Sequence, residues 1–171
     1  YTKEYFPELF EQIKARIAEG RWELVGPMWV ESDCNVTSGE SLVRQILHGV
    51  EFMEKEFGKR CHIAWLPDTF GFQPNFPQIL RKSGTPYFYT YKVNWQHQNR
   101  FPYSSYIWQG IDGSTVIASS PNNPGCYNGM VTVPELRKTK DANPQAGIID
   151  DIILPYGWGD GGGGPTRDMY E

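Results

Sequence analysis

The chain has 171 residues, which at roughly 150 residues per domain corresponds to about one domain, and its formal net charge is −4. The acidic balance argues against a protein that binds nucleic acid or an anionic membrane, because such proteins usually gather Lys and Arg on one surface. Aromatic residues make up 15% and charged residues 21%, which is enough apolar material for a core. No apolar run reaches the roughly 18 residues of a membrane-spanning helix.

The first half of the chain alternates helical and strand patterns. Apolar residues three and four apart predict a helix that Gly20 stops and a longer helix that Ser38 caps and Gly58 ends. Short apolar runs between helices predict strands. The predicted elements are helix 5–19, strand 22–25, helix 40–57, strand 61–66, helix 76–82 and strand 87–91.

The second half opens on Asp112-Gly113 between two β-prone runs, which is a strong hairpin signal. Thr132 and Glu135 form a capping box before another helix. The predicted elements are hairpin strands 106–111 and 114–118, a helix after Thr132, strand 148–156 and a helix from Pro165. Strands that alternate with helices predict an α/β fold with a mostly parallel sheet and one hairpin.

Three unusual stretches, at 26–33, 67–71 and 157–164, each follow a predicted strand. In α/β folds ligands bind beyond the carboxyl ends of the strands, so these stretches are expected to meet at one binding edge. Neither a linker nor an internal repeat divides the chain, and we interpret 1–171 as one unit. Both ends fall inside helical patterns, and we therefore expect the unit to be a piece of a longer chain.

The three cysteines, Cys34, Cys61 and Cys126, are odd in number and lack CxxC spacing. This disfavours a disulfide framework and favours a reducing compartment. We therefore expect a cytoplasmic protein, in preference to a vacuolar or lysosomal one. The histidines have no spacing typical of a zinc site.

Asp68 is the sharpest candidate for chemistry. It follows a predicted strand directly and is flanked by aromatic residues, a setting that suits a nucleophile, a metal ligand or a general acid. The alternative is that its carboxylate caps the next turn, which is the commoner role of Asp after a strand.

Asp160 lies within the glycine run 157–164, beside Trp158. Glycines let the backbone approach a ligand closely, so this loop suits a sugar site, although a surface loop is the alternative. The run also fits G-x-G-x-x-G, which predicts a nucleotide-binding α/β domain. Against that interpretation, Pro165 removes an amide donor that a phosphate would use.

Other residues near the same edge are weaker candidates. Trp29 and Trp158 could stack on sugar rings, and Lys92 could neutralise a carboxylate. Glu31, Asp33 and Glu40 flank the Trp29 loop, where solvated surface acids are the favoured interpretation and contact with substrate hydroxyls is the alternative.

Six blocks occur together and in a fixed order over nearly the whole chain. They are GRWELVGPMWVESDCN (20–35), SGESLVRQ (38–45), WLPDTFGF (65–72), FPY (101–103), WQGIDGS (108–114) and GDGGGGPT (159–166). Jointly they resemble the catalytic domain of glycoside hydrolase family 38, the class II α-mannosidases. The last block resembles the cytosolic and microbial branch of that family.

The resemblance implies a fragment of an irregular, mostly parallel βα barrel and a retaining, exo-acting hydrolase that removes terminal α-linked mannose from oligosaccharides. By this resemblance Asp68 is both nucleophile and zinc ligand, Asp160 is the acid/base candidate, and Lys92 lies where some relatives have Arg. Cobalt is an alternative metal. A homo-oligomer is compatible with the family.

The family's other metal ligands come from a His-x-Asp pair on the first strand and from a distant downstream His, and neither is in this chain. A catalytic zinc site needs about three protein ligands. The resemblance therefore implies that this segment alone is inactive.

Overall fold

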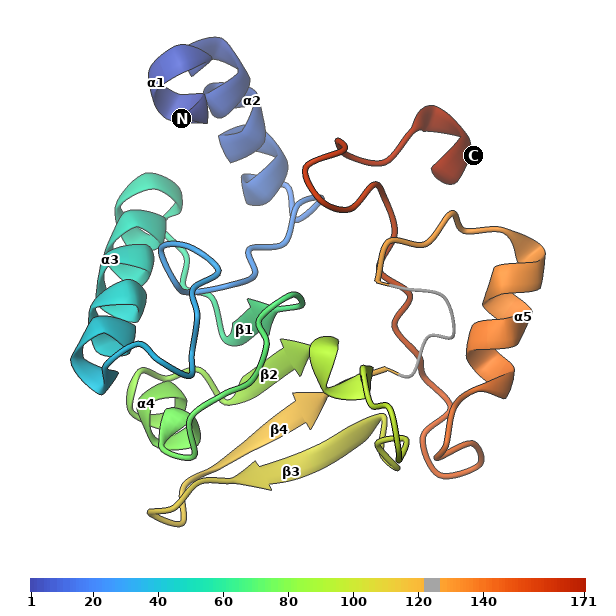
Figure 1. The fold of residues 1–171 in the computed structure, drawn as a ribbon. Coiled ribbons are helices and arrows are strands. Elements are labelled where there is room, and N and C mark those ends of the chain that lie inside the picture. Colours follow the sequence, from blue (N-terminus) through green and yellow to red (C-terminus); the bar gives the residue numbers. More distant parts are fainter. Residues whose placement is uncertain (122–126) are drawn as a thin grey trace.

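The computed structural model describes residues 1–121 and 127–171 (Figure 1). Helices and strands alternate between residues 39 and 90, as the sequence predicts, whereas the chain begins with helices that follow one another without a strand between them. The helices are α1 (Thr2–Tyr5), α2 (Pro7–Ala18), α3 (Gly39–Phe57), α4 (Phe76–Lys82) and α5 (Val133–Asp141), and the strands are β1 (Ile63–Leu66), β2 (Tyr87–Thr90), β3 (Ser105–Gln109) and β4 (Thr115–Ser119). Two 3₁₀ turns, η1 (Lys92–Asn94) and η2 (Arg167–Met169), complete the set.

The strands form a single mixed sheet in the order β1-β2-β4-β3. β1, β2 and β4 are mutually parallel, and the predicted hairpin adds β3 antiparallel to β4. The α/β class, the mostly parallel sheet and the hairpin are thus confirmed. The predicted barrel is not confirmed, because the sheet formed by the described residues is open.

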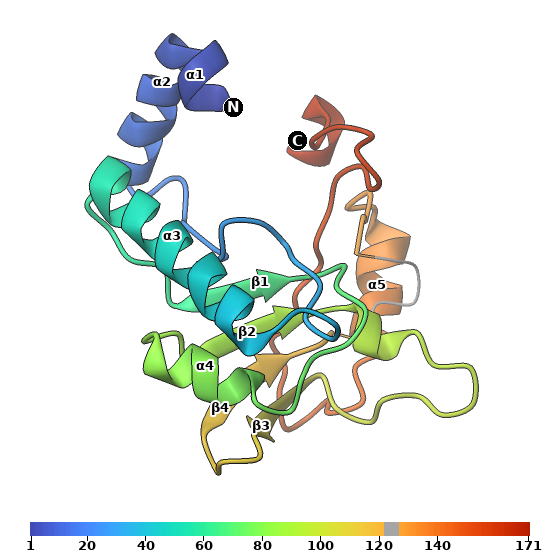
Figure 2. The ribbon, with the colours of Figure 1, turned by 60° about the vertical axis from the view of Figure 1, so that its left-hand side comes forward.

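Helices α3 and α4 cover one face of this sheet (Figure 2). α3 begins where the hydroxyl of Ser38 accepts a hydrogen bond from the Ser41 amide, and it ends at Gly58 with a left-handed φ of 62°. Spacing by four residues aligns Leu42, Ile46 and Val50 on its inner side. These side chains join Phe88 and other strand residues in the core.

The opposite face of the sheet is bare over part of its area. Tyr87, Ile117 and Ile107 lie side by side on β2, β4 and β3, because the strand register pairs Tyr87 with Ile117 and Ile117 with Ile107. All three side chains are exposed, Ile107 by 72%. The sheet therefore has one packed face and one apolar row open to solvent.

Two predicted strands are wrong. Residues 22–25 and 148–156 form no strand and do not belong to the sheet. The first is followed by one hydrogen bond from the Gly26 amide to Ile63, and the second ends in one isolated bridge between Gly129 and Tyr156. The helix predicted from Pro165 is only the three-residue turn η2.

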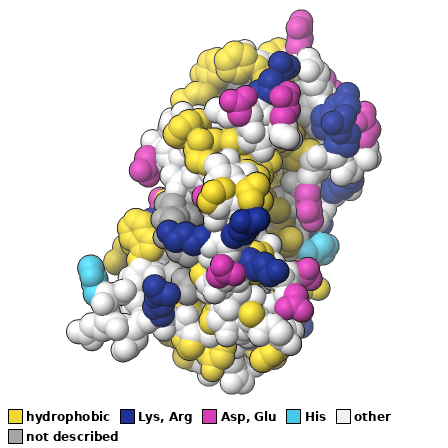
Figure 3. All heavy atoms as spheres, turned by 90° about the vertical axis from the view of Figure 1, so that its right-hand side faces the viewer, with side chains coloured by type: hydrophobic (Ala, Val, Ile, Leu, Met, Phe, Trp, Pro, Cys, Tyr) yellow, Lys and Arg dark blue, Asp and Glu magenta, His cyan; other side chains and the backbone are white. Residues whose placement is uncertain are grey.

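Figure 3 shows basic and acidic side chains interspersed with hydrophobic ones on the face that carries α5 and the C-terminal segment. Over the described residues, none of the helices combines the length and the apolar character needed to cross a membrane. Cys34 and Cys61 are buried free thiols, and Cys126 lies outside the described residues.

Candidate active site

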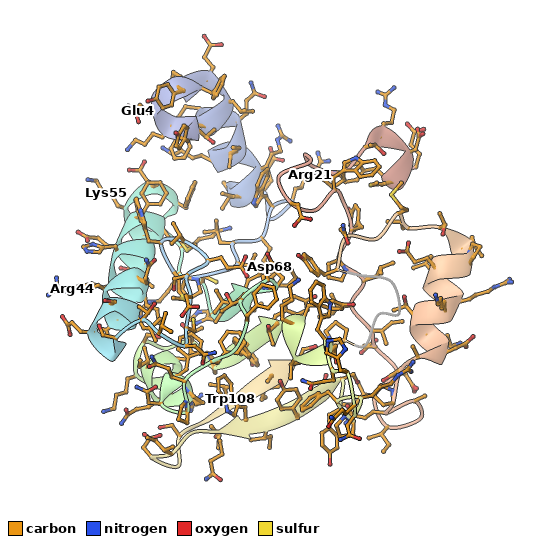
Figure 4. All side chains as sticks on the ribbon, in the orientation of Figure 1. Glu4, Arg21, Arg44, Lys55, Asp68 and Trp108 are labelled. Atoms are coloured by element: carbon orange, nitrogen blue, oxygen red, sulfur yellow. The ribbon has the colours of Figure 1, made fainter. Side chains whose placement is uncertain are left out.

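Asp68 lies in the turn that follows β1, near the arrowheads of β1 and β2 (Figure 4). Strand β1 is anchored by Ala64 and Leu66, which point into the core and are almost fully buried. Beyond Leu66 the chain leaves the sheet, so the Asp68 side chain stands at the predicted binding edge. It is 44% exposed.

Lys92 lies beside Asp68, at the end of the parallel neighbour β2. Its ammonium is 2.7 Å from Asp68 Oδ1, and its side chain is only 5% exposed. The same ammonium lies 3.3 Å from the ring centroid of Trp95 and within 5 Å of the rings of Phe70 and Tyr127. Three aromatic faces therefore hold this cation next to the carboxylate.

Tyr127 provides a second contact to the same oxygen, because its hydroxyl donates a hydrogen bond of 2.7 Å to Asp68 Oδ1. The Lys92 ammonium, and then the Tyr127 hydroxyl, lower the pKa of the Asp68 carboxyl below its ordinary value. An ionised carboxylate suits a nucleophile or a metal ligand better than a proton donor. The sequence placed Lys92 here, but the role of Tyr127 was not predicted.

The turn-capping alternative for Asp68 is not supported, because Glu31 takes that role. Glu31 Oε1 accepts hydrogen bonds from the backbone amides of Asp68 at 2.5 Å and Thr69 at 3.1 Å. Glu31 is exposed, as the sequence predicts, but its carboxylate also makes these two structural hydrogen bonds, which were not predicted. No local signal could have revealed this, since the contact joins residues 37 positions apart.

Two hollows flank the Asp68 turn. One, of about 230 Å³, is lined by Asp68, Glu31, Asp33 and neighbouring loop residues. The other, of about 560 Å³, is lined mainly by aromatic side chains and by Lys92. Phe70 lines both. Polar and apolar walls that adjoin in this way suit a sugar ring with its hydroxyl groups on one side.

Trp29 is placed elsewhere. Its ring packs edge-on against Phe52 of α3 at 5.6 Å, and it lines a separate hollow with His48, Glu51 and Lys55. Trp29 therefore lines neither of the two hollows at Asp68.

The glycine run is tied to the segment that carries Tyr127. The amide of Gly129 donates to Pro155, and the amide of Gly157 donates to Gly129. Figures 1 and 2 place this C-terminal segment beyond the arrowheads of the parallel strands. The run therefore lies on the predicted side of the sheet.

Asp160 and Trp158 are both exposed within this run. Asp160 adopts a φ of 52°, which is unusual for a residue other than glycine. Among the described residues, no hydrogen bond or ion pair holds its carboxylate. Its surroundings thus differ sharply from those of Asp68.

The G-x-G-x-x-G match in 157–164 does not have the strand and helix that a dinucleotide site requires on its two sides. Such a site requires a strand before the glycines and a helix after them, so that helix amides can meet a phosphate. Residues 148–156 do not join the sheet, and only the 3₁₀ turn η2 follows the glycines.

The side chains available as ligands limit how a metal ion could bind here. Within 1–121 and 127–171, no three His, Cys, Asp or Glu side chains lie close enough to form a cation site. Asp68 is thus a single candidate ligand, and the residues described here do not by themselves fit zinc.

Comparison with known families decides the classification. The family model described as "Glycosyl hydrolases family 38 N-terminal domain" matches residues 1–171. The chain belongs to glycosyl hydrolase family 38. The sequence resemblance is thereby confirmed.

Relatives of this family 38 chain are similar over its whole length. It is 45% identical over 171 residues to alpha-mannosidase G of Dictyostelium discoideum and 41% identical over 172 residues to alpha-mannosidase 2C1 of Homo sapiens. Alpha-mannosidase of Saccharomyces cerevisiae is 40% identical over 96% of the chain. The chain spans only 16%, 16% and 15% of these relatives, respectively.

Solved structures support the fold. An alpha-mannosidase from Enterococcus faecalis V583 superposes with a TM-score of 0.64 at 21% identity, over 90% of this chain and 17% of that one. A 4-alpha-glucanotransferase from Thermococcus litoralis superposes with a TM-score of 0.57 at 18% identity, over 70% and 19%. At these identities the likeness concerns the fold alone.

Proposed function

We propose that this family 38 domain is part of a retaining, exo-acting α-mannosidase that removes terminal mannose from oligosaccharides or from glycans derived from glycoproteins. The observation that carries the proposal is the ionised Asp68 carboxylate, held by Lys92 and Tyr127 at the carboxyl end of β1. The mannosidase names of relatives that are 40–45% identical support it.

In this proposal Asp68 attacks the anomeric carbon while the bond from that carbon to the leaving oxygen breaks. Asp160 gives its proton to that oxygen. Water then attacks the glycosyl–Asp68 ester, and Asp160 takes a proton from the water, so that both carboxyl groups are restored. A retaining mechanism needs the two carboxyl groups about 5–5.5 Å apart, and we propose that the glycine loop brings Asp160 to this distance when substrate binds.

Lys92 and Trp158 are proposed to contact substrate. The cation keeps the Asp68 carboxylate ionised and can donate to a sugar hydroxyl, and the exposed Trp158 ring offers a face for a sugar ring. Trp29 is proposed to contact a more distant part of a glycan, because it lines a different hollow.

We also propose that the parent protein uses zinc, or cobalt in its place, with Asp68 as one ligand and the others outside this chain. A metal there would act as a Lewis acid toward the sugar. Because the described residues supply one ligand, we propose that the chain alone is inactive.

The finer fold proposal is that the open sheet is part of a larger βα barrel. The helix-covered face and the bare apolar face support it, because a barrel sheet is covered by helices outside and by side chains inside. A reducing, cytoplasmic location is supported by the buried free thiols of Cys34 and Cys61. Self-association of the parent into a homo-oligomer, and the absence of nucleic-acid and membrane partners, remain proposals from the sequence.

Hydrolysis of an aryl α-mannoside by the parent polypeptide tests the main proposal. We expect turnover that a chelator removes and that zinc or cobalt restores. A folded, metal-supplemented parent without turnover would contradict it. The alternative, a non-catalytic carbohydrate-binding domain that uses 157–164, then predicts mannoside binding that is lost on Gly159→Ala.

A further inference from the structure

We propose that Glu31 is a positioning residue for Asp68: it holds the backbone of the Asp68–Thr69 turn and so fixes the direction of the Asp68 carboxylate. Its effect on catalysis rests on the function proposed above. Its effect on the turn does not, because the contacts exist whatever the reaction is.

The contacts converge on one oxygen. Glu31 Oε1 accepts from two successive backbone amides, those of Asp68 and Thr69, and lies 3.4 Å from the Thr69 hydroxyl. Thr69 is 6% exposed, and its hydroxyl also lies 3.2 Å from the carbonyl oxygen of Ser32. Hydrogen bonds from amides to a carboxylate are stronger than those to a neutral acceptor. This oxygen thus satisfies the amides that the end of β1 leaves unpaired.

Glu31 is itself held in place by α3. The Trp29 amide donates to the backbone oxygen of Gln45, and the Val30 amide donates to the Gln45 side chain at 3.0 Å. The loop before them presses on the same helix, since a Cβ on Gly49 would lie 2.0 Å from the Pro27 oxygen. Helix α3 therefore holds the backbone directly before Glu31.

The far end of the same turn is fixed by neutral groups. The Asn35 side chain donates to the Phe70 oxygen, and the Gln73 amide donates to the Cys34 oxygen. Of these ties, the one at Glu31 is the closest to Asp68 along the chain. Its loss would leave the amides of Asp68 and Thr69 without their acceptor, while the Tyr91 amide still donates to the Pro67 oxygen and Lys92 and Tyr127 still hold Oδ1.

The role requires an acceptor oxygen, and the negative charge only strengthens the two hydrogen bonds. Gln at position 31 keeps a carbonyl oxygen of similar reach, whereas Ala leaves both amides without their acceptor. This separates positioning from two other roles of a carboxylate in the hollow it shares with Asp68, namely proton transfer and metal ligation. Both of those require the acid and would fail with Gln.

The test uses Glu31→Ala and Glu31→Gln in the full-length parent, with Glu40→Ala as the control. Glu40 is an exposed acid that pairs with Arg44 on α3. Three quantities are measured: kcat and KM for an aryl α-mannoside, the rate at which a fluorinated α-mannosyl fluoride labels Asp68 as its C–F bond breaks, and hydrogen exchange of peptides covering 67–72 without substrate.

For Glu31→Ala we expect kcat and the labelling rate to fall about 30- to 100-fold with KM within about threefold, since a displacement near 1 Å can cost about that much. Exchange at 67–72 should become faster. Glu31→Gln should stay within about threefold of the parent in all three, and Glu40→Ala should match the parent.

Three results would overturn the inference. These are a Gln variant as impaired as the Ala variant, unchanged exchange at 67–72 in the Ala variant, or faster exchange with unchanged kcat. If the parent itself hydrolyses no mannoside, the proposed function fails, and exchange at 67–72 still decides whether Glu31 holds the turn.

Discussion

The two candidate catalytic acids stand in opposite surroundings. Asp68 follows a buried strand and is held by a cation, a phenol and a backbone anchored through Glu31. Asp160 lies exposed between glycines with a φ of 52°, and no described side chain binds it. A nucleophile must approach one carbon along one line, whereas a proton donor must reach leaving groups of varied shape. The contrast suits those two tasks.

The sharpest way to break this comparison is Asp68→Asn in the full-length enzyme. The amide cannot attack the anomeric carbon, so we expect kcat to fall about 10⁴-fold, as for loss of other catalytic groups. Steady-state hydrolysis of an aryl α-mannoside measures it. Turnover close to that of the parent would remove Asp68 from its proposed role.

Asp160→Asn tests whether the exposed Asp160 is the proton donor. We expect turnover of substrates with poor leaving groups to fall about 10²- to 10³-fold, the usual contribution of a general acid, with a smaller loss for activated aryl mannosides. The exposed Asp168 on η2 supplies a matched control, Asp168→Asn. Equal losses for both leaving groups would argue that another residue gives the proton.

Lys92→Met tests whether the Lys92 cation keeps the Asp68 carboxylate ionised. Lys92 lowers the pKa of Asp68, so its removal should raise that pKa. Because the ionised form is the nucleophile, the acid limb of the kcat/KM profile should move to higher pH when this opposite charge is lost. Lys92→Arg keeps the charge and should leave the limb in place. An unmoved limb in Lys92→Met would contradict the assignment.

The smallest expected effects come from two glycines, one in the loop that follows Asp68 and one in the glycine run. A Cβ on Gly71, at a φ of 104°, would lie 2.3 Å from the Asn35 side chain, whereas one on Gly161, at a φ of 74°, would meet nothing within 4 Å. We expect Gly71→Ala to destabilise the parent by about 2–4 kcal/mol and Gly161→Ala by about 1 kcal/mol. Thermal unfolding measures both. Equal costs would mean that the two loops are equally free.

Local sequence patterns predicted most of the helices and strands that the structure contains. Helices α3 and α4, strands β1 and β2 and the hairpin appear within a few residues of their predicted ranges. Residues 22–25 and 148–156 failed because a strand is defined by its neighbour, and an apolar run does not reveal whether one is present. At the site, strand ends located Asp68 and Lys92. The contacts of Glu31 and Tyr127 with Asp68 were not predicted because they span 37 and 59 positions of the chain.

The apolar row of Tyr87, Ile117 and Ile107 has a consequence for handling the protein. It lies across a sheet whose outer strand, β3, has no further strand beside it in the described structure. An exposed edge strand beside an apolar face can pair with strands of other chains, so the chain expressed by itself should be prone to aggregate. The same surface would be a recognition point for chaperones during synthesis, and a polar substitution at Ile107 is the simplest route to a soluble sample.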